Sequence, residues 1–342
     1  MSEQIAAVAA VVPSPGSPAV LADVQVDRPV AGEHDLLVEV RAVSVNPVDL
    51  KVRAGHTEGE RVLGYDAAGV VVEVGPAVTL FAPGDEVFYA GSIGRPGTDA
   101  ALHAVDERIV ARRPASLSWA EAASLPLVSI TAWEGLFDKL RLTAESRGTL
   151  LVVGATGGVG ALVLQLADAL LPGVRVVATA SAANAEQARA WGAEATVDHH
   201  ADGGDLQPQL AEAAPDGVDW VFTSRVEGEG QLALYEEVLN PFGEIVAIDD
   251  PEELDVAFLK PKSISFHWEL MFTRPLAGGD AQLPQHHLLT RVAALVDDGR
   301  VTAPVAEELA PLDAATLERA HELVRGGRVV GKVVVAAGPT AG

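Results

Sequence analysis

Residues 149–160 read TLLVVGATGGVG, which is a short apolar strand, a glycine turn and the first turn of a helix. We expect the helix to run from Val159 to about Leu170, because apolar side chains recur along it at helical spacing. The turn matches A-x-G-x-x-G, a dinucleotide fingerprint in which Ala155 replaces the first glycine. Backbone N–H groups and the positive end of the helix dipole bind a pyrophosphate at such a turn. The predicted cofactor-binding residues here are Ala155, Thr156, Gly157, Gly158, Val159 and Gly160.

Composition narrows the class of protein. The 342 residues suggest about two domains, and 49% of them are hydrophobic. The net charge of −24 argues against a nucleic-acid partner or an anionic membrane surface. The chain has no cysteine, so thiolate zinc sites and disulfides are excluded. With no basic leader segment at its start, the chain is expected to be cytoplasmic. Its expected partner is a small-molecule substrate.

Two kinds of sequence pattern divide the chain. Residues 1–125 contain short alternating strands separated by glycine and proline, which is typical of a small barrel. Residues 126–289 then alternate strands with helices. The last strand, 329–336, is expected to rejoin the first domain. The prediction is therefore one domain of residues 1–125 and 290–342, and a nucleotide-binding domain of residues 126–289.

The second region predicts a doubly wound parallel sheet of six strands. A capping box, Ser118-Trp-Ala-Glu121, predicts the start of a helix that ends before Pro126. A further helix is expected over residues 129–140. The expected strands cover residues 149–153, 174–179, 195–198, 218–223, 244–248 and 263–268, and helices are expected over 182–191, 206–213 and 230–239.

Several motifs together resemble the medium-chain dehydrogenase/reductase superfamily, and within it the quinone-oxidoreductase-like branch and the zinc-type alcohol dehydrogenase-like proteins. The resemblance spans nearly the whole chain. It implies a GroES-like β-barrel catalytic domain, a Rossmann domain, and a cleft between them for nicotinamide and substrate. Relatives in this superfamily are mostly dimers or tetramers, so a homodimer or homotetramer is expected. The motifs are the fingerprint and residues 44–51, 63–71, 83–85, 129–132 and 331–334.

The resemblance also allows the zinc site of alcohol dehydrogenases to be checked position by position. The cysteine, histidine and second cysteine ligands of that site match Asn46, Tyr65 and Leu127. None is a good zinc ligand, so no metal is expected. Without a Lewis acid, the chemistry that remains is hydride transfer to an electron-poor acceptor, a quinone or an α,β-unsaturated carbonyl. Two alternatives stay open: an alcohol dehydrogenase or carbonyl reductase of the zinc-dependent type, and a non-catalytic NADPH-binding protein.

The strand after the fingerprint helix indicates which cofactor is bound. NAD-selective folds carry an acidic residue at its end, where this chain has Thr179. A 2′-phosphate would meet no repulsion there, and Ser181 and Asn184 offer hydrogen bonds to it. The prediction is therefore NADPH rather than NADH.

The candidate catalytic residues are Tyr65, Asn46 and Asp66. Tyr65 is expected to polarise the substrate oxygen or donate a proton, with a core tyrosine as the alternative. Asn46 would bind substrate or ribose, or else form a turn before Pro47. Further cofactor contacts are expected where the strands of the sheet end and, from the resemblance, against the nicotinamide. These residues are Thr131, Ser224, Ile248 and Asp249.

Overall fold

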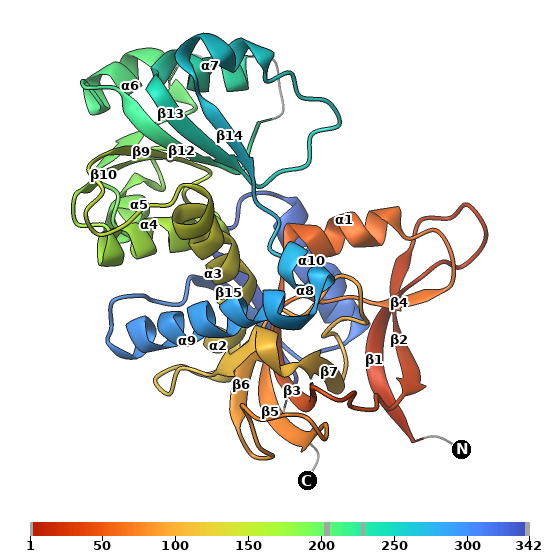
Figure 1. The fold of residues 1–342 in the computed structure, drawn as a ribbon. Helices are drawn as coiled ribbons and strands as arrows, with labels where there is room; N and C mark the ends of the chain where they lie inside the picture. The colour runs from red at the N-terminus through yellow and green to blue at the C-terminus, as the bar shows by residue number, and fades with distance from the viewer. Residues whose placement is uncertain (1–2, 202–205, 227–229, 339–342) are drawn as a thin grey trace. The chain divides into compact units, whose positions relative to one another are not determined.

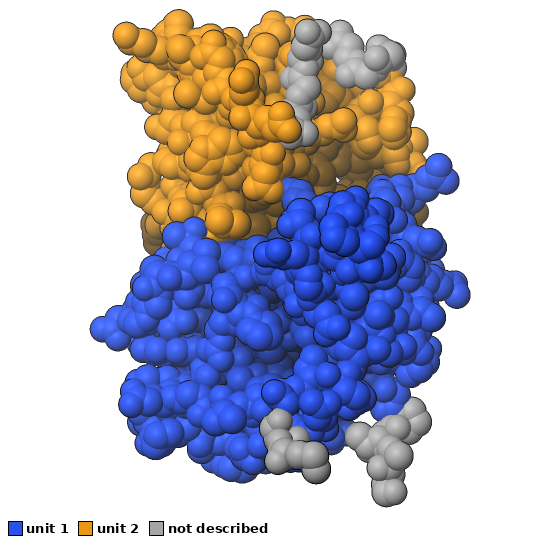
Figure 2. Space-filling view, turned by 90° about the vertical axis from the view of Figure 1, so that its right-hand side faces the viewer, with its two compact units in different colours: residues 1–130, 271–342 blue, residues 131–270 orange. Residues whose placement is uncertain are grey.

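A computed structural model describes residues 3–201, 206–226 and 230–338. The chain divides into two compact units, coloured separately in Figure 2. Unit 1 comprises Met1–Ile130 and Met271–Gly342, and unit 2 comprises Thr131–Leu270. Each unit is described by itself. No described helix is both long and apolar enough to cross a membrane.

Unit 2 contains the doubly wound sheet predicted from the fingerprint. Six parallel strands lie in the order β11-β10-β9-β12-β13-β14, which is the order of a complete Rossmann-type sheet. Helices α4 and α5 lie on one side of the sheet and α6 and α7 on the other (Figure 1). The strands are β9 (Gly148–Val153), β10 (Val174–Thr179), β11 (Ala195–Val197), β12 (Val218–Thr223), β13 (Leu239–Ala247) and β14 (Ser265–Trp268). The helices are α4 (Gly158–Leu170), α5 (Ala185–Ala190), α6 (Gln207–Ala213) and α7 (Gln231–Val238), with a 3-10 helix η4 (Ala257–Lys262) before β14.

Unit 1 is the β-rich domain that the sequence predicts. Its larger sheet has the strand order β15-β16-β3-β5-β6-β8, with β7 also paired to β3, and a smaller sheet has the order β2-β1-β4. Strand β16, near the end of the chain, pairs antiparallel with β3. The expectation that the tail rejoins the first domain is therefore confirmed. The strands are β1 (Gln4–Val11), β2 (Val20–Asp27), β3 (Asp35–Val45), β4 (Glu60–Val62), β5 (Ala67–Val74), β6 (Glu86–Tyr89), β7 (Leu102–Asp106), β8 (Val110–Arg112), β15 (Val305–Leu309) and β16 (Lys332–Ala336).

The helices of unit 1 cover the ends and faces of its sheets. The capping box is present, since Ser118 Oγ accepts the N–H of Glu121 and the Glu121 carboxylate accepts the N–H of Ser118. The next helix begins at Pro126 rather than at 129, because proline is well suited to a first helical turn. It runs from unit 1 into a π-helix of unit 2, η2 (Glu134–Lys139). The helices are α1 (Pro47–Gly55), α2 (Trp119–Ala123), α3 (Pro126–Trp133), α8 (Thr273–Ala277), α9 (Leu283–Asp297) and α10 (Ala314–Arg325), with η1 (Glu107–Ile109) and η5 (Gly279–Gln282).

The unit boundaries differ from the predicted domain boundaries, most of all at the return to unit 1. The sequence predicts that return at residue 290, whereas the contacts place it at Met271. Helix α9 explains the difference, because it packs against β8 and η1, and His286 Nδ1 lies 2.7 Å from the carbonyl oxygen of Val110.

Candidate functional site

Asn46 and Asp49 fix the turn that follows β3 in unit 1. The Asp49 carboxylate accepts the backbone N–H of Asn46 at 2.7 Å and that of Gly64 at 3.1 Å. Both side chains are buried, with 1% of each residue exposed. Because Asp49 accepts across the first turn of α1, it also stabilises the start of that helix. The amide of Asn46 is thus held in a fixed position inside the barrel.

Asp66 and Lys332 complete a buried polar cluster around that amide. Asn46 donates from Nδ2 to Asp66 Oδ2 at 2.8 Å, and Lys332 Nζ donates to Asn46 Oδ1 at 2.6 Å. Lys332 Nζ also lies 3.2 Å from Asp66 Oδ2 and 3.1 Å from the carbonyl oxygen of Val45. The other Asp66 oxygen, Oδ1, accepts the N–H of Leu127 at 2.7 Å. The cluster is therefore a buried ion pair bridged by an amide.

Burial shifts the pKa values within this cluster. It raises the pKa of the Asp66 carboxyl, opposed by the nearby Lys332 ammonium, and it lowers the pKa of Lys332, opposed by Asp66. Burial also raises the pKa of Asp49 to about 7, and that of Asp99 well above its usual range. With more buried carboxyl groups than ammonium groups, the cluster retains protons near neutral pH.

Tyr65 lies between this cluster and an arginine. Its side chain is fully buried, its hydroxyl oxygen is 3.4 Å from Arg61 Nη2, and its ring meets Phe272 edge to face with centroids 5.3 Å apart. Burial raises the pKa of the phenol, so the hydroxyl keeps its proton at neutral pH. A protonated phenol can donate a hydrogen bond or a proton to an oxygen.

The residues in the metal-ligand positions do not suit zinc. The Asn46 amide oxygen accepts from an ammonium, Leu127 offers an N–H to Asp66, and Tyr65 is a neutral phenol. The positive charge of Lys332 lies within hydrogen-bonding distance of the first of these positions. Among residues 3–201, 206–226 and 230–338 there is also no group of three or more histidine, aspartate or glutamate residues that could hold a metal ion.

The glycine turn of unit 2 suits a dinucleotide. Gly154 has φ +79°, and a Cβ there would lie 2.1 Å from Ser224 Oγ. A Cβ at Gly160 would lie 2.4 Å from the carbonyl oxygen of Gly154. Only glycine lets the turn fold this closely onto α4, whose cap residue is Gly157 and whose first N–H groups have no partner within the helix. That end of the helix suits a pyrophosphate.

The structure brings most of the other predicted cofactor residues to the strand ends around this turn. Thr179 Oγ1 accepts the N–H of Gly154 at 3.1 Å, so its hydroxyl supports the turn. Ser224 Oγ donates to the carbonyl oxygen of Val153 at 3.2 Å. Asp249 Oδ2 accepts the N–H of Val226 at 2.6 Å, directly after Ile248 at the end of β13. Thr131 is buried in α3.

Asp198 was not among the predicted residues, yet it contacts the loop that follows β10. Its Oδ2 accepts the N–H of Ala182 at 3.0 Å, and this alanine lies between Ser181 and Asn184. Hydrogen bonds from the N–H groups of His200 and then of Ala182 lower the pKa of Asp198, so it is ionised at neutral pH. A carboxylate therefore stands beside the residues expected to bind the 2′-phosphate. The sequence did offer a signal for this carboxylate, because Asp198 is the last residue of the expected strand 195–198.

Unit 2 also contains a buried pair of glutamates whose pairing the sequence does not predict. Glu134 lies in the π-helix η2 and Glu269 follows β14, and they are 3% and 5% exposed. Lys139 Nζ is 3.5 Å from Glu269 Oε2. Burial and the neighbouring Glu134 raise the pKa of Glu269 to about 9. The pair therefore holds a proton at neutral pH, at the sheet edge where ligands bind in such folds.

Comparison with known proteins identifies the family. Residues 32–114 match the alcohol dehydrogenase GroES-like domain, and residues 191–335 match the zinc-binding dehydrogenase family. A zinc-type alcohol dehydrogenase-like protein of Staphylococcus aureus (strain MSSA476) is 36% identical over 315 residues, covering 90% of this chain and 92% of that protein. The chain belongs to the medium-chain dehydrogenase/reductase superfamily. It is an oxidoreductase of that superfamily and one of its zinc-type alcohol dehydrogenase-like proteins.

More distant members carry names that describe an activity. The NADPH-dependent alkenal/one oxidoreductase of Arabidopsis thaliana is 31% identical, covering 89% of this chain and 72% of that protein. The quinone oxidoreductase of Coxiella burnetii has a TM-score of 0.78 at 26% identity, with 98% of this chain and 99% of that chain covered. A mycobacterial protein solved in complex with NADPH has a TM-score of 0.81 at 26% identity, covering 97% and 99%.

Proposed function

We propose that the chain is a zinc-independent, NADPH-dependent reductase of an electron-poor acceptor, a quinone or an α,β-unsaturated carbonyl. The observation that carries this proposal is the buried cluster of Asn46, Asp66 and Lys332. Asn46 stands where alcohol dehydrogenases have a zinc ligand, and the Lys332 ammonium lies 2.6 Å from its amide oxygen. A positive charge of the chain itself is therefore fixed beside this position. Acceptors that are already electron-poor need no Lewis acid to take up a hydride.

The residues of unit 2 support the cofactor part of the proposal. The glycine turn of residues 154–160 and the N-terminus of α4 would hold the pyrophosphate of NADPH, and Ser181 and Asn184 would face its 2′-phosphate. When bound, NADPH supplies the hydride. The superfamily fold binds NAD(P), and the mycobacterial relative is solved with NADPH.

Tyr65 is the residue that we propose as the hydrogen-bond donor to the acceptor oxygen. Reduction adds a hydride to the acceptor and leaves negative charge on its oxygen, so a donor there lowers the barrier. Tyr65 remains protonated because of its burial, and Arg61 at 3.4 Å favours a transient phenolate. The proton that completes the product comes from this hydroxyl or from solvent.

The test is reductive turnover with the metal controlled. The protein, stripped with EDTA and checked by metal analysis, is mixed with an ortho-quinone or an aliphatic enone, and the loss of NADPH or NADH is followed. Turnover that survives EDTA and is faster with NADPH supports the proposal. Turnover that returns only with added zinc favours the zinc-dependent alternative. Tight NADPH binding without turnover on any electron-poor acceptor favours the non-catalytic one.

We also propose a cytoplasmic homodimer or homotetramer. Among the described strands, β14 is the last of the parallel sheet of unit 2, so its outer edge can pair with a strand of a second copy. Trp268 on that strand and Leu270 just after it are 49% and 52% exposed. Light scattering should report a dimer or tetramer, and Trp268→Glu should shift it to monomer; a wild-type monomer contradicts the proposal.

A further inference from the structure

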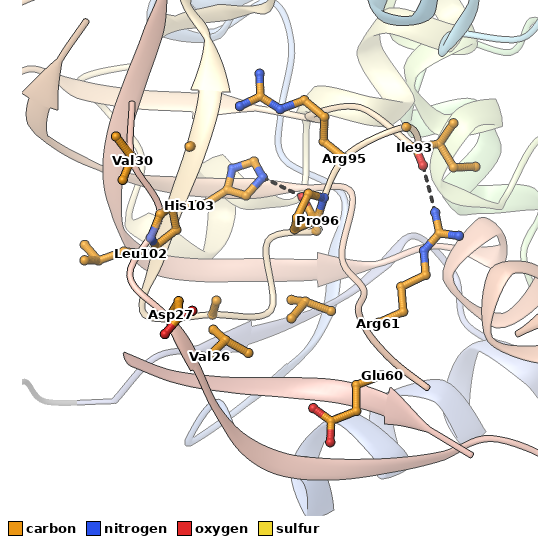
Figure 3. Close-up of a pocket in the computed structure, with 16 residues that line it drawn as sticks. Val26, Asp27, Val30, Glu60, Arg61, Ile93, Arg95, Pro96, Leu102 and His103 are labelled. Carbon is orange, nitrogen blue, oxygen red and sulfur yellow. Dashed lines mark hydrogen bonds between the residues drawn. The ribbon is translucent and has the colours of Figure 1, made fainter. Parts of the chain in front are cut away.

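Unit 1 contains a cavity of about 730 Å³, and none of the candidate catalytic residues Tyr65, Asn46 and Asp66 lines it. Strands β2, β4 and β7 and the loop of residues 93–97 form its walls (Figure 3). Its volume falls in the range of small-molecule sites. The walls are mostly apolar, and the larger apolar side chains are Val26, Val30, Val62, Ile93, Pro96 and Leu102. An apolar ligand of modest size would bury its surface here.

Two of the polar side chains that line the cavity, Arg95 and His103, already have partners within the protein. Arg95 makes a bidentate pair with Asp35, at 2.8 and 2.7 Å. One ring nitrogen of His103 lies 3.0 Å from the carbonyl oxygen of Pro96 and the other 3.2 Å from Tyr89 Oη. Both ring nitrogens of His103 are thus engaged, and the charge of Arg95 is paired with the carboxylate of Asp35.

Arg61 is the exception. It is half-buried, and in Figure 3 its guanidinium points towards the backbone of Ile93. Only Nη2 is engaged, with the carbonyl oxygen of Ile93 at 2.7 Å and with Tyr65 Oη at 3.4 Å. Within the described ranges, no carboxylate pairs with Arg61 and its remaining N–H groups make no hydrogen bond. Eight other arginines each pair with a carboxylate: Arg28, Arg41, Arg53, Arg95, Arg108, Arg112, Arg113 and Arg141.

The charges of the cavity select the chemistry of the ligand. A guanidinium only donates hydrogen bonds, so the ligand must present an acceptor. The exposed carboxylates of Asp27 and Glu60 also line the cavity and disfavour an anion, whereas Arg61 itself disfavours a cation. An uncharged molecule with an apolar body and a strong acceptor meets these conditions, and the carbonyl oxygen of a ketone is such an acceptor.

We infer that this cavity is a second small-molecule site, which binds an uncharged apolar ketone with its carbonyl oxygen on Arg61. A ligand there would draw on the same guanidinium that contacts the Tyr65 hydroxyl. Occupancy would thus alter the hydroxyl that we assign to the reaction. This coupling rests on the proposed function, whereas the binding itself does not.

Benzophenone is a suitable probe, because it is uncharged and forms a covalent adduct with nearby C–H bonds when irradiated. The full-length protein, without cofactor, is dialysed against benzophenone for affinity and then irradiated for peptide mapping. Adducts are expected on peptides that carry residues 26–30, 60–62 and 93–104. Arg61→Met keeps the stem and removes the donor, so affinity should fall about tenfold.

Two further variants make the test decisive. Arg41→Met is the same substitution in unit 1 outside the cavity, and it should bind like the wild type. Leu102→Trp fills the cavity without touching Arg61 and should abolish labelling of these peptides, even if Arg61→Met fails to fold. Adducts elsewhere, equal affinity in all variants, or tighter binding of benzophenone-4-carboxylate would each overturn the inference. Because the assay uses no reductant, its outcome is independent of whether the protein turns over.

Discussion

Lys332 and Asp66 form an ion pair at 3.2 Å inside unit 1, with the two residues only 4% and 0% exposed. Asn46 joins them, because its amide donates to Asp66 and accepts from Lys332. Such a pair contributes little over an apolar substitute, but loss of one partner leaves a buried charge without compensation. The pair therefore holds the Lys332 ammonium at a fixed point of the barrel. Each of its two residues compensates the buried charge of the other.

Replacement of Lys332 alone should be strongly destabilising. Lys332→Met leaves the Asp66 carboxylate unpaired, and we expect it to lower the free energy of unfolding by about 3 to 5 kcal/mol. The double variant Asp66→Asn/Lys332→Met should recover much of that loss, and Lys260→Met, at an exposed lysine, should have little effect. Urea unfolding measures all three. If the single and double variants are equally unstable, an uncompensated Asp66 charge is not the cause of the destabilisation.

Loss of the Tyr65 hydroxyl should impair turnover more than folding. Tyr65→Phe removes the proposed donor, and we expect kcat to fall by about a hundredfold with little change in the KM for NADPH. Tyr89→Phe is the matched control, since Tyr89 is also buried but bonds to His103. Steady-state kinetics with the better acceptor tests this prediction. Equal losses in the two variants would mean that Tyr65 is only a core tyrosine.

The features that the sequence predicted well are local in the chain. Strands β10 and β12 have the predicted bounds, since each is a short apolar run between turns. The Ser118–Glu121 capping box depends on residues three positions apart. By contrast, Lys332 reaches Asn46 across 286 positions, and a lysine beside a run of valines does not indicate which side chain it meets. Glu134 and Glu269 were missed for the same reason, because neither has a local signal for its partner.

The Glu134–Glu269 pair predicts that stability falls as the pH rises through neutrality. The pKa of Glu269 is raised from 4.5 to about 9, chiefly by burial, so the folded protein binds a proton that the unfolded chain releases. The unfolding free energy should therefore fall as pH rises from about 5 to 9, by about 1.4 kcal/mol per pH unit at the steepest. Glu269→Gln should flatten this dependence, whereas Glu186→Gln, on the exposed side of α5, should not. An unchanged slope in Glu269→Gln would contradict the shared proton.

The position of Asp198 limits the preference for NADPH. Its carboxylate bonds to the loop that carries Ser181 and Asn184, so it would repel a 2′-phosphate there. Asp198→Asn should tighten NADPH binding by about fivefold and leave NADH binding nearly unchanged. Fluorescence titration of each cofactor measures this, with Glu194→Gln at an exposed site before β11 as the control. Equal gains for both cofactors would mean that the phosphate binds elsewhere.

Acid should destabilise the fold through His321 in α10. Burial, followed by the charge of Arg53, lowers its pKa from 6.5 to about 4, and neither ring nitrogen has a hydrogen-bond partner among the described residues. The folded state therefore favours neutral imidazole, and the resulting stability is present above pH 6.5 and is lost as pH falls towards 4. At pH 5 the loss amounts to about 2 kcal/mol. His321→Leu removes both the titration and the unsatisfied nitrogens, so its unfolding free energy should exceed that of the wild type by more at pH 5 than at pH 7. His287→Leu, at an exposed histidine of α9, should keep the wild-type pH dependence. If His321→Leu also kept the wild-type pH dependence, His321 would not be the acid-sensitive group.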